Sequence, residues 1–247
     1  MTNVGGIEAV SESQKKRLEK VLVISQSSAS HLYPILLGYN FRIVEKDPDF
    51  IICYGGDGTV LFSERTFPQI PKLIVKKSNV SRKCDYPFQN IGGILHKVRA
   101  GEYQIKEEMK LETEFIDEKL VGLNEIQLHN KQPIYAIRFS LSVNQKEFSG
   151  LIGDGAIFAT PFGSTGYYQS TGGKDFQKGI GVSFNNLHNL HLASFVVPED
   201  SVISVKIDRG PALVLADNNE RFFELKNHDV FTVKKSTSIA NLIYVST

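Results

Sequence analysis

The sequence predicts a protein of two parts, an N-terminal α/β domain with a parallel sheet and a C-terminal all-β domain of sandwich type. Within the first 100 residues, apolar runs alternate with helical segments, which is typical of a parallel sheet covered on both faces. Farther along, short runs rich in Val, Ile, Phe and Thr follow one another without long helices, which is typical of a β-sandwich. We therefore expect two domains, comprising residues 1–100 and 101–247.

The N-terminal part is expected to alternate strands with helices. The charged segment Ser13–Lys20 is predicted to be helical, and a short helix is expected over His31–Leu37. A third helix, Thr59–Phe67, follows a glycine turn directly and is stopped by Pro68 and Pro71. Strands are expected where apolar residues are contiguous, at Val21–Ser25, Phe41–Glu45, Phe50–Tyr54 and Leu73–Val75.

The C-terminal part is expected to consist of strands separated by Gly, Pro, Asn or Asp. The segment Ile134–Asn144 alternates most clearly, because Phe139, Leu141 and Val143 fall on one face. The last predicted strand, Ala240–Val245, could pack on either domain. The other predicted strands are Lys110–Ile116, Glu125–His129, Gly155–Thr160, Ser201–Asp208 and Ala212–Ala216.

Composition narrows the class of protein. A hydrophobic content of 41% supports a real core, and a charged content of 22% is far from the profile of disorder. The net charge of +1 gives no reason to expect a nucleic-acid or anionic-membrane partner. Two cysteines are too few for a disulfide framework, and no run approaches the roughly 20 apolar residues of a membrane span. Residues 1–13 do not resemble a secretory signal, so we expect a soluble, cytoplasmic protein.

The first candidate functional string is Gly55-Gly56-Asp57-Gly58-Thr59, between an apolar strand and a predicted helix. Glycine backbone at the end of a strand can approach a phosphate, and a helix N-terminus supplies amide donors for an anion. A carboxylate there would repel the phosphate unless it accepts a proton from a hydroxyl or holds a magnesium ion. Asp-Gly is also an ordinary turn dipeptide, but a turn alone does not explain the whole arrangement. We therefore expect phosphoryl transfer.

The second candidate string is Thr160-Pro161-Phe162-Gly163-Ser164-Thr165-Gly166-Tyr167. Hydroxyl groups interleaved with glycine supply hydrogen-bond donors without bulk, and Tyr167 can stack on a base. The alternative is a plain loop between two strands. A third candidate, Asn124-Glu125, could bind a ribose diol or an amino group, although Asn at the entrance of a strand is ordinary turn chemistry.

These strings together strongly resemble the NAD kinase family in order and spacing. The resemblance extends from about Ile51 to the C-terminus, and Phe223–Val230 is similar to the closing segment of the family. It implies an N-terminal α/β domain, a C-terminal β-rich domain, an active site in the cleft between them, and a homodimer or homotetramer. It also implies transfer of a terminal phosphoryl group from ATP or polyphosphate to the adenosine ribose 2′-hydroxyl of NAD. The strings that carry the resemblance are Gly55–Thr59, Asn124-Glu125, Asp154-Gly155 and Thr160–Tyr167.

The resemblance also implies a role for each matching residue. Asp57 would be the base that takes the proton of the 2′-hydroxyl, while Gly55, Gly56 and Thr59 would face the phosphates. Mg²⁺ would accompany the phosphoryl donor, and no metal site made of protein ligands is expected. Asp154 would hold the nicotinamide side of the substrate or a ligand of a neighbouring subunit. The residues expected to contact NAD are Asp57, Gly58, Asn124, Glu125, Asp154, Ala156, Thr165, Gly166, Tyr167, Tyr168, Gln169 and Ser170.

Three positions need comment. The segment Val75–Lys83 is basic where the family usually has glycine and asparagine, so it either contacts phosphates or is a solvated loop. Phe162 and Gly166 replace the commoner threonine and alanine, which could alter the fit of the nucleotide. Asp217 aligns with an acidic residue that is frequent near the C-terminus of the family.

Two other functions are weighed against the NAD kinase hypothesis. Lipid kinases of the diacylglycerol or sphingosine type also resemble the Gly-Gly-Asp-Gly-Thr string, but Asn124-Glu125 and the second string argue against them. A non-catalytic NAD(P) sensor could retain the pocket, yet it would have no use for a base at Asp57. ATP is the expected donor, with polyphosphate as the alternative.

Overall fold

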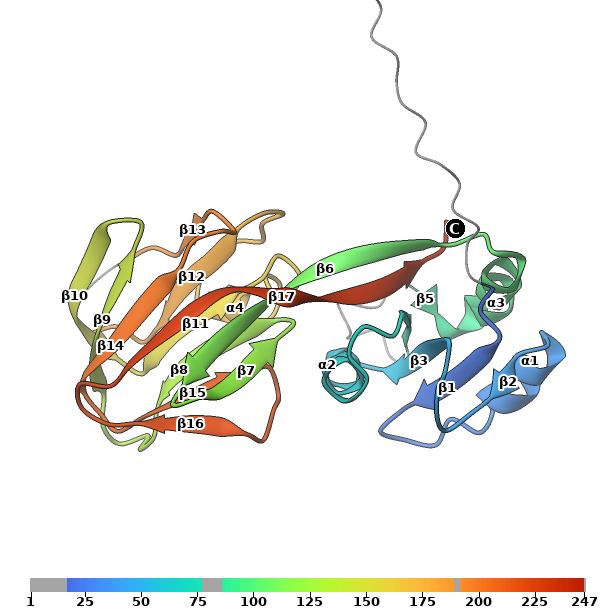
Figure 1. The fold of residues 1–247 in the computed structure, drawn as a ribbon, viewed down its shortest axis with the longest axis horizontal. Coiled ribbons are helices and arrows are strands. Elements are labelled where there is room, and N and C mark those ends of the chain that lie inside the picture. Colours follow the sequence, from blue (N-terminus) through green and yellow to red (C-terminus); the bar gives the residue numbers. More distant parts are fainter. Residues whose placement is uncertain (1–16, 77–85, 189–191, 247) are drawn as a thin grey trace, which may run out of the picture.

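A computed structural model describes residues 17–76, 86–188 and 192–246 of the chain. Two halves lie side by side, and two long strands, β6 (Gln104–Phe115) and β17 (Val230–Tyr244), run from one half into the other (Figure 1). The N-terminal half carries the three longer helices, whereas the C-terminal half consists almost entirely of strands. The predicted fold class, an α/β part followed by a sandwich-like β part, is confirmed.

The N-terminal half is a parallel sheet with helices on both faces. Helices α1 (Leu32–Gly38) and α3 (Ile91–Ala100) bury apolar side chains on one face, and α2 (Asp57–Thr66) covers the other. The five strands all pair in parallel, and helices α1 and α2 lie in connections between them. In order across the sheet they are β2 (Arg42–Ile43), β1 (Lys20–Ile24), β3 (Phe50–Gly55), β4 (Lys72–Lys76) and β5 (Tyr86–Pro87).

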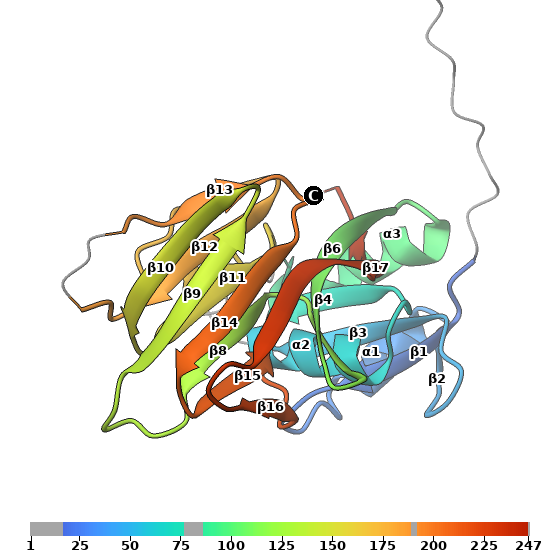
Figure 2. The same ribbon diagram turned by 60° about the vertical axis from the view of Figure 1, so that its left-hand side comes forward.

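The C-terminal half is a sandwich of two antiparallel layers, which Figure 2 shows one behind the other. Its core lies between the layers and includes Leu128, Phe139, Phe158 and Phe231, all almost inaccessible to solvent. The six-stranded layer is, in order, β13 (Phe195–Val197), β12 (Ile180–Asn185), β11 (Gly155–Ala159), β8 (Glu125–Asn130), β15 (Ala212–Ala216) and β16 (Phe222–Leu225). The facing layer contains β10 (Lys146–Gly153), β9 (Ile137–Val143), β14 (Ile203–Arg209), β17, β6 and β7 (Glu118–Gly122).

Strands β6 and β17 make the two halves one structure. They pair from Gln104 opposite Tyr244 to Glu114 opposite Thr232, with a shift of register between Lys235 and Ile239. At its far end β17 also pairs in parallel with β4, so the larger sheet continues from one half into the other. An apolar cluster around α2 accordingly contains residues from both halves: Val60, Leu61, Leu123, Ala240 and Leu242.

A buried ion cluster fixes α2 against these strands. Glu64 on α2 pairs with Lys72 on β4 and with Lys110 on β6, and all three residues are almost fully buried. Burial lowers the pKa of Lys72, and the neighbouring Glu64 carboxylate opposes that shift. Removing Glu64 alone would leave two ammonium groups without their shared counter-charge, so the position of α2 depends on it.

The structure corrects one predicted helix and adds elements that were not predicted, among them the helix α3 and the strands β7, β10, β12, β13 and β16. The predicted helix Ser13–Lys20 is wrong where the chain is described, because the backbone N–H groups of Glu19 and Lys20 donate to the Asp49 carboxylate, at 3.1 and 2.9 Å, and Lys20 begins β1. Residues 13–16 lie outside the described part. Helix α3 was not predicted, although Ile91, Ile94, Leu95 and Val98 have helical spacing and are all buried.

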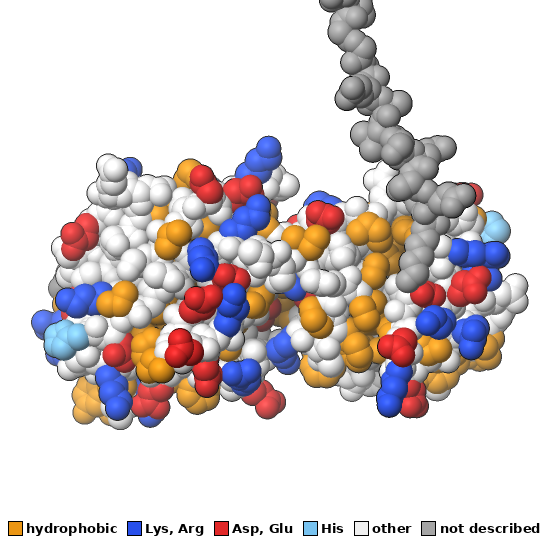
Figure 3. Space-filling view, viewed as in Figure 1, with side chains coloured by type: hydrophobic (Ala, Val, Ile, Leu, Met, Phe, Trp, Pro, Cys, Tyr) orange, Lys and Arg blue, Asp and Glu red, His pale blue; other side chains and the backbone are white. Residues whose placement is uncertain are grey.

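The surface carries charges of both signs. On the face that Figure 3 shows, acidic and basic side chains are interspersed rather than gathered into a field of one sign. Among the helices of the described ranges, none has the length and apolar character to cross a membrane.

Candidate functional site

The first glycine string lies where the predicted strand and helix meet. Strand β3 ends at Gly55, Gly56 precedes the helix, and Asp57 is the first residue of α2. A side chain at Gly56 would meet no other atom within 4 Å, so this backbone is open. Asp57 is half-buried in the first turn, where free backbone amides favour an anion. The geometry therefore suits a phosphate close to a carboxylate.

A hollow of about 430 Å³ borders this string. Its described lining carries hydroxyl and amide groups and no charged side chain. A polyphosphate in this hollow would need a cation brought from elsewhere to neutralise its charge. The lining residues are Ser25, Gln26, Ser27, Tyr54, Gly55, Gly56 and Thr59.

The second string packs tightly against the start of β8. The hydroxyl of Thr160 donates to the Leu123 carbonyl at 2.7 Å and accepts from the Gly163 N–H at 2.9 Å. A Cβ atom at Gly163 would lie only 2.0 Å from the Asn124 carbonyl oxygen. The string is therefore held on the backbone of Asn124 through Thr160 and Gly163.

Asn124 and Glu125 are buried beneath this string. The Asn124 side chain is 7% exposed, and its carboxamide oxygen accepts no hydrogen bond from the described part of the chain. A Cβ atom at Gly166 would lie 3.7 Å from both Asn124 Nδ2 and Glu125 Oε2, so glycine leaves space above these two groups. A buried acceptor without a partner is costly, which indicates that a ligand completes the site.

The backbone of Asn124-Glu125 is held by Asp217. Its carboxylate accepts from the N–H groups of Leu123, Asn124 and Glu125 at 2.7, 2.8 and 3.1 Å. Burial raises the pKa of Asp217, while the three N–H donors act in the opposite direction. Asp217 therefore fixes the start of β8 from a turn more than 90 residues away in sequence.

The next residue, Asn218, reaches across to the first glycine string. Its amide donates to the Gly58 carbonyl at 3.3 Å, and its oxygen accepts from Arg65 of α2 at 2.9 Å. The turn Asp217-Asn218 thus joins Asp57-Gly58 to Asn124-Glu125, two motifs that lie on different halves of the molecule. Sequence reasoning singled out Asp217 only weakly and missed Asn218 and Arg65, because no local pattern marks such a long-range contact.

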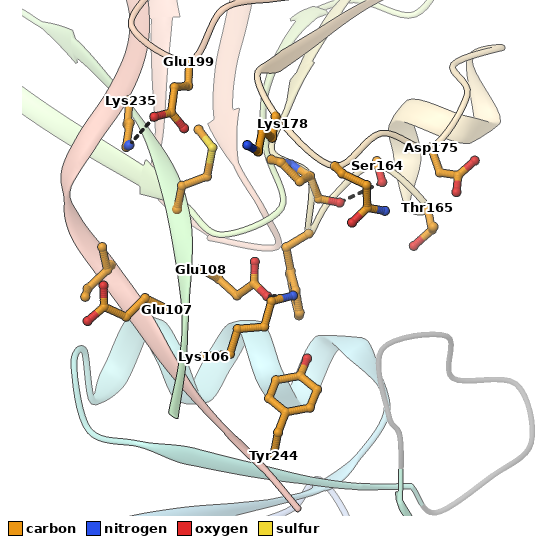
Figure 4. Close-up of a pocket in the computed structure, with 15 residues that line it drawn as sticks. Lys106, Glu107, Glu108, Ser164, Thr165, Asp175, Lys178, Glu199, Lys235 and Tyr244 are labelled. Carbon is orange, nitrogen blue, oxygen red and sulfur yellow. Dashed lines mark hydrogen bonds and ion pairs between the residues drawn. The ribbon is translucent and has the colours of Figure 1, made fainter. Parts of the chain in front are cut away.

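A larger hollow, about 670 Å³, lies between the second string and the strands β6 and β17 (Figure 4). Phe162, Ser164 and Thr165 form one wall. The opposite wall carries paired charges, with Lys106 beside Glu108 at 2.7 Å and Lys235 beside Glu199 at 3.1 Å. Of the residues predicted to contact NAD, only Thr165 lines this hollow.

The remaining predicted residues are spread along the six-stranded layer. The Asp154 carboxylate accepts from Asn130 and Asn186, at the end of β11 opposite to Thr160. The five residues of β11 separate Asp154 from Thr160, a distance of about 20 Å along an extended strand. Ala156 is buried in the sandwich core and Tyr168 in a small apolar cluster under α4 (Tyr167–Ser170), whereas Gln169 and Ser170 are exposed. The basic segment after Lys76 lies outside the described residues.

Comparisons with known proteins identify the family of the chain. The model of the "ATP-NAD kinase C-terminal domain" family matches residues 123–245, which include Asn124-Glu125, the second string and Asp217. The NAD kinase of Methanothermobacter thermautotrophicus is 30% identical over 220 residues, which cover 86% of this chain and 77% of that protein. The chain belongs to the NAD kinase family.

Other relatives extend the agreement to the fold. The NAD kinase of Thermoplasma acidophilum is 28% identical over 202 residues, covering 79% of this chain and 73% of that one. The yeast NADH kinase in complex with NADH superposes with a TM-score of 0.80 at 17% identity, over 96% of this chain and 89% of that chain. An Archaeoglobus fulgidus NAD kinase in complex with ATP gives a TM-score of 0.78 at 22% identity, over 90% and 92%. The NAD kinase fold therefore extends over both halves of this chain.

Proposed function

We propose that this member of the NAD kinase family transfers the terminal phosphoryl group of ATP, or of inorganic polyphosphate, to the adenosine ribose 2′-hydroxyl of NAD, giving NADP. The observation that carries the proposal is the turn Asp217-Asn218, which is hydrogen-bonded to both Asp57-Gly58 and Asn124-Glu125. Related proteins support the proposal as well, because the chain belongs to the NAD kinase family and the relatives named above are NAD kinases. Neither a lipid kinase nor a non-catalytic sensor finds support among them.

In the proposed reaction Asp57 is the general base. Its carboxylate accepts the 2′-hydroxyl proton as the ribose oxygen attacks the terminal phosphorus, and the bond from that phosphorus to the bridging oxygen breaks. The position of Asp57 in the first turn of α2 supports this role, since the amides there and the open backbone of Gly56 suit the donor phosphates. Thr59 lines the same hollow.

The acceptor would lie along the start of β8 and the second string. Asn124 and Glu125 offer a buried amide and carboxylate to the adenosine portion, and Thr165, Gly166 and Tyr167 lie above or beside them. Asp154, at the other end of β11, would take the nicotinamide side, because an extended dinucleotide can span the distance between the two ends.

Mg²⁺ would enter with the donor. In the described part of the chain, no group of three or more His, Cys, Asp or Glu side chains could hold a metal ion. The hollow beside Gly55 nevertheless fits a magnesium–phosphate complex, since its hydroxyl and amide oxygens suit a hard cation that keeps several waters. When bound, the ion would neutralise the charge that develops on the transferred phosphoryl group.

The proposal also covers the location, oligomeric state and partners of the enzyme. We propose a cytoplasmic location, a homodimer or homotetramer, and no nucleic-acid or membrane partner. The near-neutral net charge and the mixture of surface charges support the absence of polyanionic partners.

The proposal is tested by offering the purified protein each acceptor with each donor. NAD, NADH and a diacylglycerol would be combined with ATP and with polyphosphate, and the products separated and identified. We expect the 2′-phosphate of NAD or NADH and no phosphorylated lipid. Phosphorylation of the lipid alone, or no transfer to either dinucleotide in the presence of Mg²⁺, would overturn the proposal.

A further inference from the structure

Every second side chain of β8 lies on the outer face of the six-stranded layer, and three of them form a row there. Because successive residues of a strand point to opposite faces, Ile126 and Leu128 enter the sandwich core while Glu125, Gln127 and His129 face outward. Glu125 belongs to the predicted site, whereas Gln127 and His129 were not predicted to have a role.

Hydrogen bonds connect the row and fix its polarity. Gln127 Nε2 donates to Glu125 Oε1 at 3.0 Å, and His129 Nε2 lies 3.1 Å from Gln127 Oε1. The Gln127 amide nitrogen faces Glu125 and its oxygen faces His129, and an amide oxygen can only accept a hydrogen bond. His129 therefore carries its proton on Nε2 and donates to Gln127. The row has one direction, from His129 through Gln127 to the Glu125 carboxylate.

The far end of the row supports Tyr167. The rings of His129 and Tyr167 are stacked, with centroids 5.7 Å apart and planes 15° from parallel. Tyr167 is the first residue of α4, which has only four residues, so the helix itself does little to orient the ring. Burial lowers the pKa of His129, which keeps the imidazole neutral near neutral pH.

We propose that His129 and Gln127 are positioning residues for the acceptor, holding the Glu125 carboxylate and the Tyr167 ring in one hydrogen-bonded and stacked unit. The inference rests on the proposed function, because both ends of the unit are expected to contact NAD. The unit contains no residue of the first glycine string, so it acts on the acceptor and not on the phosphoryl donor. Disrupting the hydrogen bonds or the ring stack of this unit is expected to raise the KM for NAD, while the KM for ATP and kcat change little.

Three substitutions at His129 separate the contribution of the ring stack from that of the hydrogen bond to Gln127. His129→Ala removes both the stack and the hydrogen bond, His129→Phe keeps an aromatic stack, and His129→Gln keeps a donor for Gln127. Since an aromatic pair contributes about 0.5–1.5 kcal/mol, His129→Ala is expected to raise the KM for NAD roughly 3- to 10-fold. His129→Phe is expected to restore most of that loss. His96→Ala is the matched control, because His96 is exposed on α3 and contacts Tyr39 away from β8.

The readouts are kcat, the KM values for NAD and for ATP, the NAD dissociation constant by calorimetry, and Tm. An unchanged KM and dissociation constant for NAD in His129→Ala overturn the inference, as does an equal rise in the KM for ATP. If His129→Ala does not fold, failure of His129→Phe to bind NAD better than His129→Gln overturns it instead. Turnover of the unsubstituted protein tests the proposed function separately, since the NAD affinities of the variants are measured without turnover.

Discussion

The two glycine strings of this protein use the same residue for opposite purposes. At Gly56, before α2, an added Cβ would meet nothing within 4 Å, whereas at Gly163 it would lie 2.0 Å from the Asn124 carbonyl oxygen. Gly56 leaves its backbone open beside a hollow, whereas Gly163 lies against the backbone of Asn124, just before β8. Gly56 therefore leaves room for a ligand, whereas Gly163 allows the close packing on which the proposed acceptor site is built.

The difference extends to the side chains around each string. Beside the first, the described lining of the hollow has hydroxyl and amide groups and no charged group, and the basic segment after Lys76 lies outside the described residues. Under the second, Asn124 and Glu125 are buried and fixed by Asp217. We infer that the half holding the acceptor is built in advance, whereas the donor side is completed by what binds there.

The largest effect is expected where the two regions meet, at Asp57. Asp57→Asn keeps the shape of the side chain but removes the base, and a positioned general base contributes about 10²–10⁴-fold. We expect turnover to fall by about that factor while the dissociation constant for NAD changes little. The measurements are kcat and calorimetric binding of NAD. Asp117→Asn, in the exposed turn between β6 and β7, is the control, and near-normal turnover of Asp57→Asn would show that another group is the base.

The contrast between the glycines is tested by a matched pair of alanine substitutions. Gly163→Ala forces a methyl group into the backbone of β8 and is expected to cost about 1–3 kcal/mol of stability. Gly56→Ala has room for its methyl group and a φ of −107°, so Tm should stay nearly unchanged while the KM for the donor rises. Unfolding in urea and donor kinetics measure the two effects. Equal losses of stability in Gly163→Ala and Gly56→Ala would contradict the proposed difference between the two glycines.

The link between the two regions is expected to show a smaller effect. Asn218→Ala removes the hydrogen bonds to Gly58 and Arg65, and bonds of this kind contribute about 0.5–1.5 kcal/mol each. Both bonds are exposed, so we take the low end, about 1 kcal/mol for the pair, and expect kcat/KM for NAD to fall roughly 5-fold. Arg65→Met added to Asn218→Ala should cause little further loss, because both act through one contact. Full additivity in this double-mutant cycle would contradict the link.

The smallest predicted effect concerns pH and the acceptor side. The pKa of His129 is lower in the folded state than its ordinary value of 6.5, so between the two values the unfolded chain binds a proton that the folded chain does not. The free energy of unfolding should therefore rise with pH through this window and reach its full value above about 6.5. Comparing urea unfolding at pH values above and below 6.5 for the wild type and His129→Phe measures this contribution. Identical pH slopes would contradict it.

Much of the fold could be predicted from local patterns, and the errors have physical causes. The buried strand Phe50–Tyr54 and the alternating strand after Ile134 were placed correctly because one periodicity dominates each. The helix predicted at Ser13–Lys20 was wrong because hydrogen bonds to Asp49, some 30 residues away, hold residues 19 and 20 as strand. Local propensity does not contain that contact.

In the candidate site, too, some residues could be predicted from local patterns and others could not. Asp57, Asn124 and the second string could be singled out because each is a compact string with unusual chemistry. Asn218, Arg65 and Gln127 are ordinary residues whose importance arises only from the neighbours that the fold supplies. Whether a glycine serves a ligand or a backbone contact could not be predicted either, since the local sequence does not say which atoms the fold brings next to it.

The most direct test of the account is a crystal structure of the protein with NAD bound. We predict that a carboxylate oxygen of Asp57 lies within about 2.6–3.2 Å of the 2′-hydroxyl of the adenosine ribose. A bound NAD whose 2′-hydroxyl faces away from Asp57, with another group in hydrogen-bond contact with it, would contradict the central claim.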